Sequence, residues 1–283
     1  MITEEDKEKL LKEIKKKIKE IRSYTPRVAI FGDTGVGKSS LCNAIFGKEI
    51  AKISDVEACT REPQEILIGD KEDGGIVLID VPGVGEDPQR HQEYMNLYKS
   101  LLPKVDLVLW AIKADDRKFA TSMEVYEKIL KPNLKKCPVV FVITQIDKIE
   151  PIDEWYDNGK VLGKTQLQNL LKKSNDISSR FDISTNKIVA VSAKNNYNIV
   201  ELVEKIVEVL PNEKKYSFAR EAKEENVSKE TITKAEKGVW DSIKEVAGDA
   251  YDVVKDVVVD IVVESAKKIF KDVLKKLPKF PFW

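Results

Sequence analysis

The chain has 283 residues, of which 42% are apolar and 34% charged, so it can form one sizeable core and is not composed like a disordered protein. Lys plus Arg and Asp plus Glu total 48 each, which argues against a general nucleic-acid binder and against membrane binding through net charge. Cys42, Cys59 and Cys137 are odd in number and lack CxxC spacing, as is typical of a reducing cytosol. Charges throughout the first twenty residues argue against a signal peptide, and no uncharged apolar run is long enough to span a membrane. We therefore expect a cytoplasmic protein.

The first 25 residues have the pattern of one amphipathic helix. Thr3 and Asp6 have the spacing of a capping box, and Pro26 marks the end of the pattern. The apolar residues recur every three or four positions, at Leu10, Leu11, Ile14, Ile18 and Ile21. Residues 1–25 are predicted to form an N-terminal amphipathic helix.

Between residues 27 and 210, short apolar runs alternate with helical patterns, which predicts an α/β fold with a mostly parallel sheet and helices on both faces. The predicted strands are residues 27–31, 65–68, 76–80, 106–112, 138–144 and 187–192. The turn Asp73-Gly74-Gly75 joins the second and third runs too tightly for a crossover helix, so these two strands should pair as an antiparallel hairpin.

A last helix of this domain is predicted after Asn198, ending at Pro211. A polar stretch follows, and helix is then predicted for residues 239–246 and, from the spacing of the apolar residues, for residues 250–277. The expected domains are therefore the N-terminal helix, an α/β domain of residues 26–211 and a helical domain of residues 212–283.

Gly32-x4-Gly37-Lys38-Ser39 matches the Walker A pattern, in which successive backbone N–H groups and a helix N-terminus surround a phosphate. Lys38 is expected to reach the β and γ phosphates of a nucleotide, and the Ser39 hydroxyl to bind Mg²⁺. The residues predicted to line the phosphate site are Asp33, Thr34, Gly35, Val36, Gly37, Lys38, Ser39 and Ser40.

A second motif follows the third predicted strand, which ends in Asp80 before Pro82-Gly83. A carboxylate at this strand end can hold Mg²⁺ through water, and the Gly83 N–H can donate to a γ-phosphate. Thr60 lies in the polar loop between the two motifs, where its hydroxyl could bind the same Mg²⁺. Ser39, Thr60 and Asp80 are the predicted metal ligands, and Lys38, Thr60 and Gly83 the predicted catalytic residues.

Two further strand ends carry polar residues, Thr144-Gln145-Ile146-Asp147 and Ser192-Ala193-Lys194. A carboxylate such as Asp147 accepts two hydrogen bonds from guanine N1–H and N2–H, which adenine cannot offer, and buried polar groups left unpaired make that discrimination strong. The pattern favours GTP over ATP. Asp147 and Ala193 are predicted to recognise guanine, and the nucleotide-binding residues at these two strand ends are predicted to be Thr144, Gln145, Asp147, Ser192, Ala193 and Lys194.

Five motifs follow one another along the chain: Gly32–Ser39, Thr60, Asp80–Gly83, Thr144–Asp147 and Ser192–Lys194. This ordered set resembles the five G motifs of translation-factor-class P-loop GTPases, in the branch of Era, septins and immunity-related GTPases. The sequence is similar to bacterial GTPases of about this length that are described as ribosome-binding. The resemblance covers residues 27 to about 210 and implies a three-layer, six-stranded sheet with an antiparallel second strand. It also implies GTP and GDP as ligands, Mg²⁺ as cofactor and hydrolysis of GTP.

The sequence departs from the patterns of such GTPases at four positions, which lie in three motifs. The usual Asn-Lys-x-Asp is here Thr144-Gln145-Ile146-Asp147, so we expect guanine selectivity with weaker binding. Val84 stands where Ras-like enzymes place a water-orienting glutamine, so intrinsic hydrolysis should be slow. Gly35 stands where potassium-stimulated relatives have an asparagine, which argues against potassium stimulation.

Other residues could complete the catalytic site. His91 could position water or reach a partner's nucleotide, although the sequence favours a solvated helix histidine. Arg61 or Arg117 could act as an arginine finger across a homodimer formed through the nucleotide face, or could be ordinary surface charges.

The lysine-rich end of the chain, with Phe270, Phe280, Phe282 and Trp283, could lie on an anionic membrane or expose its lysines while its apolar face packs on the protein. Three uses of a GTPase remain open: self-assembly, a ribosome-assembly switch and a membrane-associated enzyme. The sequence shows no specific nucleic-acid motif in support of the ribosome contact. An ATP-dependent P-loop enzyme is the alternative outside this class.

Overall fold

The computed structural model describes residues 3–33, 35–47, 64–68, 75–81, 91–157, 161–248 and 251. The chain forms two compact units. Helices α1, α8 and α9 belong to one unit, and the sheet with α2, α4, α5 and α6 belongs to the other. The predicted site residues fall in the sheet unit.

Within the described ranges, one sheet contains six strands in the order β2-β3-β1-β4-β5-β6. The strands are β1 (Arg27–Phe31), β2 (Gln64–Ile68), β3 (Ile76–Asp80), β4 (Leu107–Lys113), β5 (Val139–Thr144) and β6 (Ile188–Ala190). Their bounds lie within two residues of the predicted runs, because each run is rich in the β-branched and aromatic residues that suit a buried strand. The predicted α/β fold is confirmed.

Four of the strand pairings are parallel, and their register aligns the carboxyl ends of the strands. Ile30 of β1 pairs with Asp80 of β3, and Lys113 of β4 pairs with Thr144 of β5. β2 neighbours β3, and the seven residues between them are too few for the crossover that a parallel pair needs, which supports the predicted hairpin. The segments after β1, β3, β5 and β6 therefore start from the same edge of the sheet.

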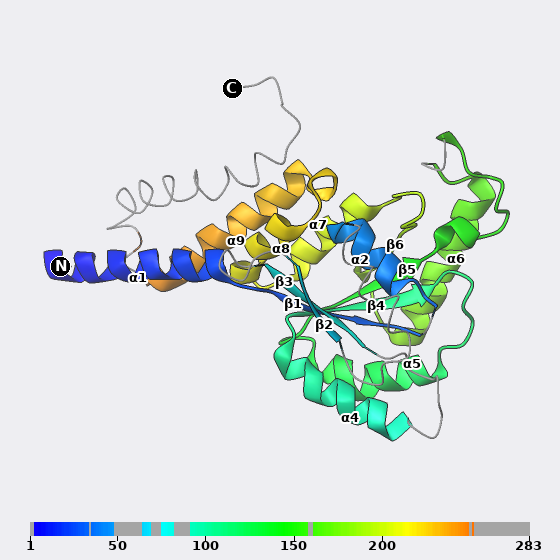
Figure 1. Ribbon diagram of the computed structural model, residues 1–283, viewed down its shortest axis with the longest axis horizontal. Helices are drawn as coiled ribbons and strands as arrows, with labels where there is room; N and C mark the ends of the chain where they lie inside the picture. The colour runs from blue at the N-terminus through cyan, green and yellow to red at the C-terminus, as the bar shows by residue number, and fades with distance from the viewer. Residues whose placement is uncertain are drawn as a thin grey trace. The chain divides into compact units, whose positions relative to one another are not determined.

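Helices cover both faces of the sheet. The helices of this unit are α2 (Lys38–Phe46), α4 (His91–Leu101), α5 (Ala120–Val125), α6 (Lys164–Phe181) and α7 (Ile199–Val209), of which α7 extends beyond the unit at its end. Figure 1 shows α4 and α5 along one side of the sheet and α2 on the other. Because both faces are covered, the central strands are apolar at nearly every position rather than alternating with polar residues.

The core under α4, α5 and α6 is built around aromatic rings. Phe181 of α6 is fully buried, and its ring centroid lies 5.1 Å from that of Phe141 and 5.6 Å from that of Tyr126, both edge-to-face. Trp110 of β4 contacts the same cluster, with its ring 6.4 Å from Phe181. These contacts hold the neighbouring strands β4 and β5 against the helices.

The other unit contains α1 (Glu4–Ser23), α8 (Asn212–Glu221) and α9 (Lys229–Ala247). The predicted capping box is present at Thr3 and Asp6, and the hydrogen bonds from Thr3 lower the pKa of the Asp6 carboxyl. Ser217 of α8 donates to the Ile21 carbonyl at 3.0 Å. Gly238 lets α9 approach α8 closely, since a Cβ there would lie 2.7 Å from the Asn212 oxygen.

Two helical regions differ in extent from their predictions. α8 lies in the stretch that the sequence marks only as polar, and α9 begins at Lys229 rather than at Val239. Their charged residues obscure the apolar stripe, although Ser228 caps α9 by accepting from the Thr231 N–H. The predicted helix at residues 250–277 and its lysines lie outside the described residues, apart from residue 251. In the described part of the chain, no helix has the length and apolarity needed to cross a bilayer.

Removing the central ring of the aromatic core should cost much of the stability of the sheet unit. We expect Phe181→Ala to lower the free energy of unfolding by about 3–5 kcal/mol, because it leaves a cavity among buried rings. Urea denaturation followed by tryptophan fluorescence measures this loss. Leu171→Ala on the same helix is the control, since Leu171 is 54% exposed. Equal losses in the two variants would contradict this account of the core.

Candidate nucleotide-binding site

The loop between β1 and α2 has backbone conformations that favour glycine. Gly32, Gly35 and Gly37 have φ angles of +146°, +78° and +88°. A side chain at Gly32 would also meet β4, because its Cβ would lie 2.4 Å from the Ala111 carbonyl oxygen. Glycine therefore allows the loop to turn sharply while remaining close to the sheet.

The positive groups of the loop lie together. Lys38 Nζ donates to the carbonyl oxygens of Gly32 at 3.0 Å and Asp33 at 3.4 Å, so its charge lies against the loop. Helix α2 begins at Lys38 and has no acidic residue in its first turn. The unpaired N–H groups and the partial positive charge of a helix N-terminus attract an anion. The segment can therefore bind a phosphate group.

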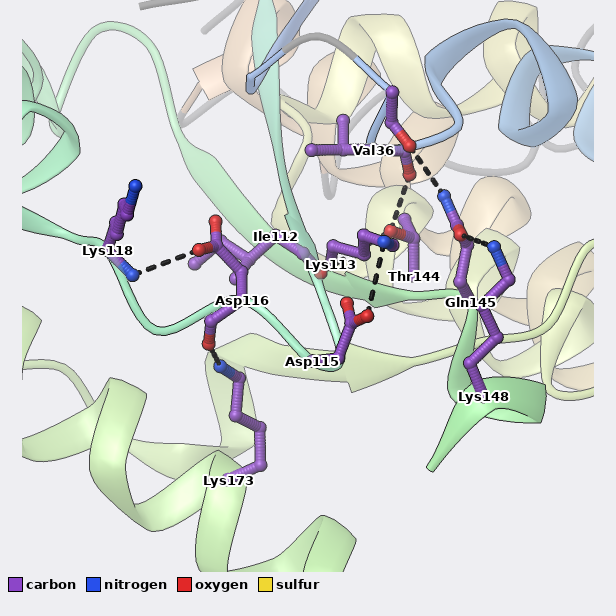
Figure 2. Close-up of polar contacts among 11 residues, drawn as sticks. Val36, Ile112, Lys113, Asp115, Asp116, Lys118, Thr144, Gln145, Lys148 and Lys173 are labelled. Carbon is purple, nitrogen blue, oxygen red and sulfur yellow. Dashed lines mark hydrogen bonds and ion pairs between the residues drawn. The ribbon is translucent and has the colours of Figure 1, made fainter. Parts of the chain in front are cut away.

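Two side chains at the end of β5 hold successive carbonyl groups of this loop (Figure 2). The Thr144 hydroxyl donates to the Val36 carbonyl at 2.6 Å, and the Gln145 amide donates to the Gly35 carbonyl at 2.7 Å. In a trans peptide the N–H points opposite to the carbonyl, so fixing a carbonyl also fixes the N–H of the next residue. The end of β5 therefore sets the direction of the backbone donors at Val36 and Gly37.

The same strand end carries a fixed carboxylate. Asp147 lies in a short 3₁₀ turn, Ile146–Lys148, and its Oδ1 accepts a 2.6 Å hydrogen bond from the Ser192 hydroxyl. Ser192 is fully buried and also accepts from the Asn195 N–H at 3.2 Å. A backbone bridge between Ser192 and Tyr197 closes the loop after β6. The turn at Ile146–Lys148 and the loop after β6 thus hold Asp147 at the carboxyl end of β5. Asp147 is close in sequence to Thr144 and Gln145, which contact the phosphate loop.

Comparison with known proteins identifies the family of the chain. A model of the family described as 50S ribosome-binding GTPase matches residues 27–145. YkfA and YfjP of Escherichia coli strain K12 are 40% and 38% identical over 69% and 71% of this chain, covering 66% and 67% of their own lengths. GTPase Era of Caldanaerobacter subterraneus is 30% identical, with 67% of this chain and 56% of Era aligned.

The chain belongs to the Era-like P-loop GTPases. It spans about two thirds of the length of the two Escherichia coli relatives and about half of that of Era. Among solved structures, an Era variant of Aquifex aeolicus bound to GDP.AlF4- is 26% identical and has a TM-score of 0.47, with 66% of this chain and 57% of that chain covered. Family membership implies a guanine nucleotide as the ligand of the site.

Most of the predicted site residues of this GTPase lie at one edge of its sheet. The loop and first turn of α2 contain Asp33, Gly35, Val36, Gly37, Lys38, Ser39 and Ser40, whereas Thr144, Gln145, Asp147, Ser192, Ala193 and Lys194 follow β5 and β6. Asp80 ends β3 opposite Ile30, which places its backbone beside the start of the phosphate loop.

Other predicted residues lie outside the described part of the chain. These are Thr34, Thr60, Arg61, Gly83 and Val84, together with the side chains of Asp80 and His91. Their roles stay predictions. His91 is the first residue of α4.

The loop after β4 is held in place around Arg117. The Lys118 N–H donates to Asp116 Oδ1 at 2.9 Å, and Lys173 of α6 donates to the Asp116 carbonyl (Figure 2). Burial lowers the pKa of the Lys173 ammonium, which the nearby Asp116 opposes. Arg117 itself is exposed between these fixed neighbours. It is therefore available to a partner, as the predicted arginine finger requires.

One residue of the site was missed by the sequence analysis. Lys148 donates to Gln145 Oε1 at 2.6 Å, on the opposite side of the amide from the phosphate loop (Figure 2). In the sequence, only the position of Lys148 directly after Asp147 could have indicated that it belongs to the site. The direction of its side chain depends on the turn at Ile146–Lys148, which the sequence does not give.

The phosphate loop should tolerate a side chain at Gly35 far better than at Gly32. We expect Gly32→Ala to lower the free energy of unfolding by about 2–4 kcal/mol, because it adds a backbone clash to an unfavourable φ. Gly35→Ala meets nothing within 4 Å, so we expect only about 1 kcal/mol from its φ. Urea denaturation without nucleotide compares the two, and a larger loss at Gly35 would contradict the close approach to β4.

Proposed function

We propose that this protein binds GTP and GDP with Mg²⁺ and hydrolyses the γ-phosphate of GTP by attack of water. The proposal rests mainly on one observation: the end of β5 contacts the phosphate loop and also leads into Asp147. Thr144 and Gln145 hold the phosphate loop, and Asp147, close by in the sequence, is fixed by Ser192. The loop proposed to bind phosphate and the carboxylate proposed to recognise guanine are thus both held at the end of one strand, β5.

The residues around the loop fit a magnesium ion by their chemistry. Ser39 lies in the first turn of α2, and the backbone register places Asp80 beside the start of the loop. Hydroxyl and carboxylate oxygens are the ligands that Mg²⁺ prefers, and Thr60 is proposed as the third. When bound, Mg²⁺ would neutralise charge on the β and γ phosphates.

The chain's own groups would then bind and orient the nucleotide. Lys38 would neutralise phosphate charge, and backbone N–H groups from Gly35 to Ser40 would surround the phosphate oxygens. Asp147 would accept from the guanine edge, with Ala193 closing the base site. Gly83 would donate its N–H to the γ-phosphate. Val84 offers no polar group to orient water, so we propose that a second copy or another partner completes the site.

Loss of the base-reading carboxylate should abolish the preference for guanine. We expect Asp147→Ala to weaken GDP binding about 100-fold or more, because two charge-assisted hydrogen bonds are lost. Fluorescence titration with a labelled GDP, with ATP as competitor, measures both affinity and selectivity. Asp153→Ala removes an exposed carboxylate of the following loop and should leave binding unchanged. If Asp147→Ala kept the wild-type preference for GDP over ATP, the base site would be wrongly assigned.

Self-activation predicts a dependence of turnover on protein concentration. We expect phosphate release from GTP per enzyme molecule to rise as the protein concentration rises, because the missing catalytic group would come from another copy. Arg61, Arg117 and His91 are the first residues to replace, and Lys38→Ala should remove turnover at every concentration. Flat, low turnover would contradict self-activation and point to a different partner.

A ribosome-assembly role is the second candidate, and the description of the matching family favours it. Co-sedimentation with 50S subunits in the presence of GTP or GDP tests this role. A membrane role rests only on residues 252–283, which lie outside the described residues, and flotation with anionic liposomes would test it.

A further inference from the structure

Three groups of the site form a continuous chain of hydrogen bonds, from Lys148 through Gln145 to Gly35. Lys148 Nζ donates to Gln145 Oε1 at 2.6 Å, and Gln145 Nε2 donates to the Gly35 carbonyl at 2.7 Å (Figure 2). Gln145 has a positive φ of 55°, which is uncommon outside glycine. A Cβ at Gly37 would lie only 3.3 Å from Nε2, so the amide is packed against the loop.

A carboxamide can hold a carbonyl only in one of its two orientations. If the Gln145 amide turned over, its oxygen would face the Gly35 oxygen, and two acceptors would repel each other. The Lys148 ammonium has donors only, so it can pair with Gln145 Oε1 but not with the amide nitrogen. The contact therefore selects the orientation that directs Nε2 toward the loop.

We propose that Lys148 is a positioning residue for nucleotide binding: it orients the Gln145 amide, which holds the Gly35 carbonyl and thereby the phosphate loop. This inference rests on the proposed nucleotide function of the same site. Because Lys148 is exposed, its hydrogen bond contributes little to the stability of the fold. Its effect is to orient the Gln145 amide. A lysine at position 145 would combine both roles, because its ammonium could donate to the Gly35 carbonyl directly.

A double-mutant cycle on positions 145 and 148 tests the proposal. In the natural background, Lys148→Met should weaken binding of labelled GDP about threefold to tenfold, as expected for one lost hydrogen bond. Lys148→Arg keeps a donor and should restore most of the affinity. In the Gln145→Lys background, Lys148→Met should leave affinity unchanged or improve it, because the two ammonium groups repel each other. Lys172→Met, at an exposed lysine of α6, is the control.

A second readout needs no nucleotide. The Val36 N–H donates to the Asp33 carbonyl at 3.4 Å, and hydrogen exchange at this amide should speed up in Lys148→Met but not in Lys172→Met, since only the first loosens the loop. An equal loss of GDP affinity in both backgrounds, or unchanged exchange, would overturn the positioning role and leave only a general charge effect. If the unmodified protein bound no guanine nucleotide, the proposed function would fail, while exchange would still decide whether Lys148 holds the loop.

Discussion

The site depends on the hydrogen bonds by which the end of β5 holds two carbonyl groups of the phosphate loop. A loop with three glycines has many backbone conformations available, and only some of them direct successive N–H groups to one point. Thr144 and Gln145 select among these conformations by fixing the Val36 and Gly35 carbonyls. The phosphate loop is thus ordered in part by residues more than 100 positions later in the chain.

The sheet makes these long-range contacts possible. Parallel pairing of β1, β4, β5 and β6 brings the carboxyl ends of distant strands to one edge, where loops can meet. The buried rings around Phe181 support β4 and β5 from one face. A stable scaffold with polar residues only at the strand ends is what a nucleotide site of this kind requires, because small displacements would break its short hydrogen bonds.

The departures from the usual base-recognition motif have a physical explanation in the structure. The Thr144 hydroxyl reaches the Val36 carbonyl directly at 2.6 Å, so a shorter side chain still braces the loop. Gln145 contacts the loop through its amide, and Lys148 supplies positive charge nearby. Asp147, the residue that matches the usual motif, accepts a hydrogen bond from Ser192.

The sequence by itself determined the strands, their mostly parallel arrangement and the positions of the phosphate and base motifs, because apolar runs and glycine spacing are local signals. It underestimated α8 and the first half of α9, whose charged residues hide the apolar stripe. Only the tertiary structure decided that Gly32 must pass β4 closely, that Gln145 contacts Gly35 and that Lys148 contacts Gln145. These facts depend on strand register and side-chain direction, which are set by the packing of segments far apart in the chain.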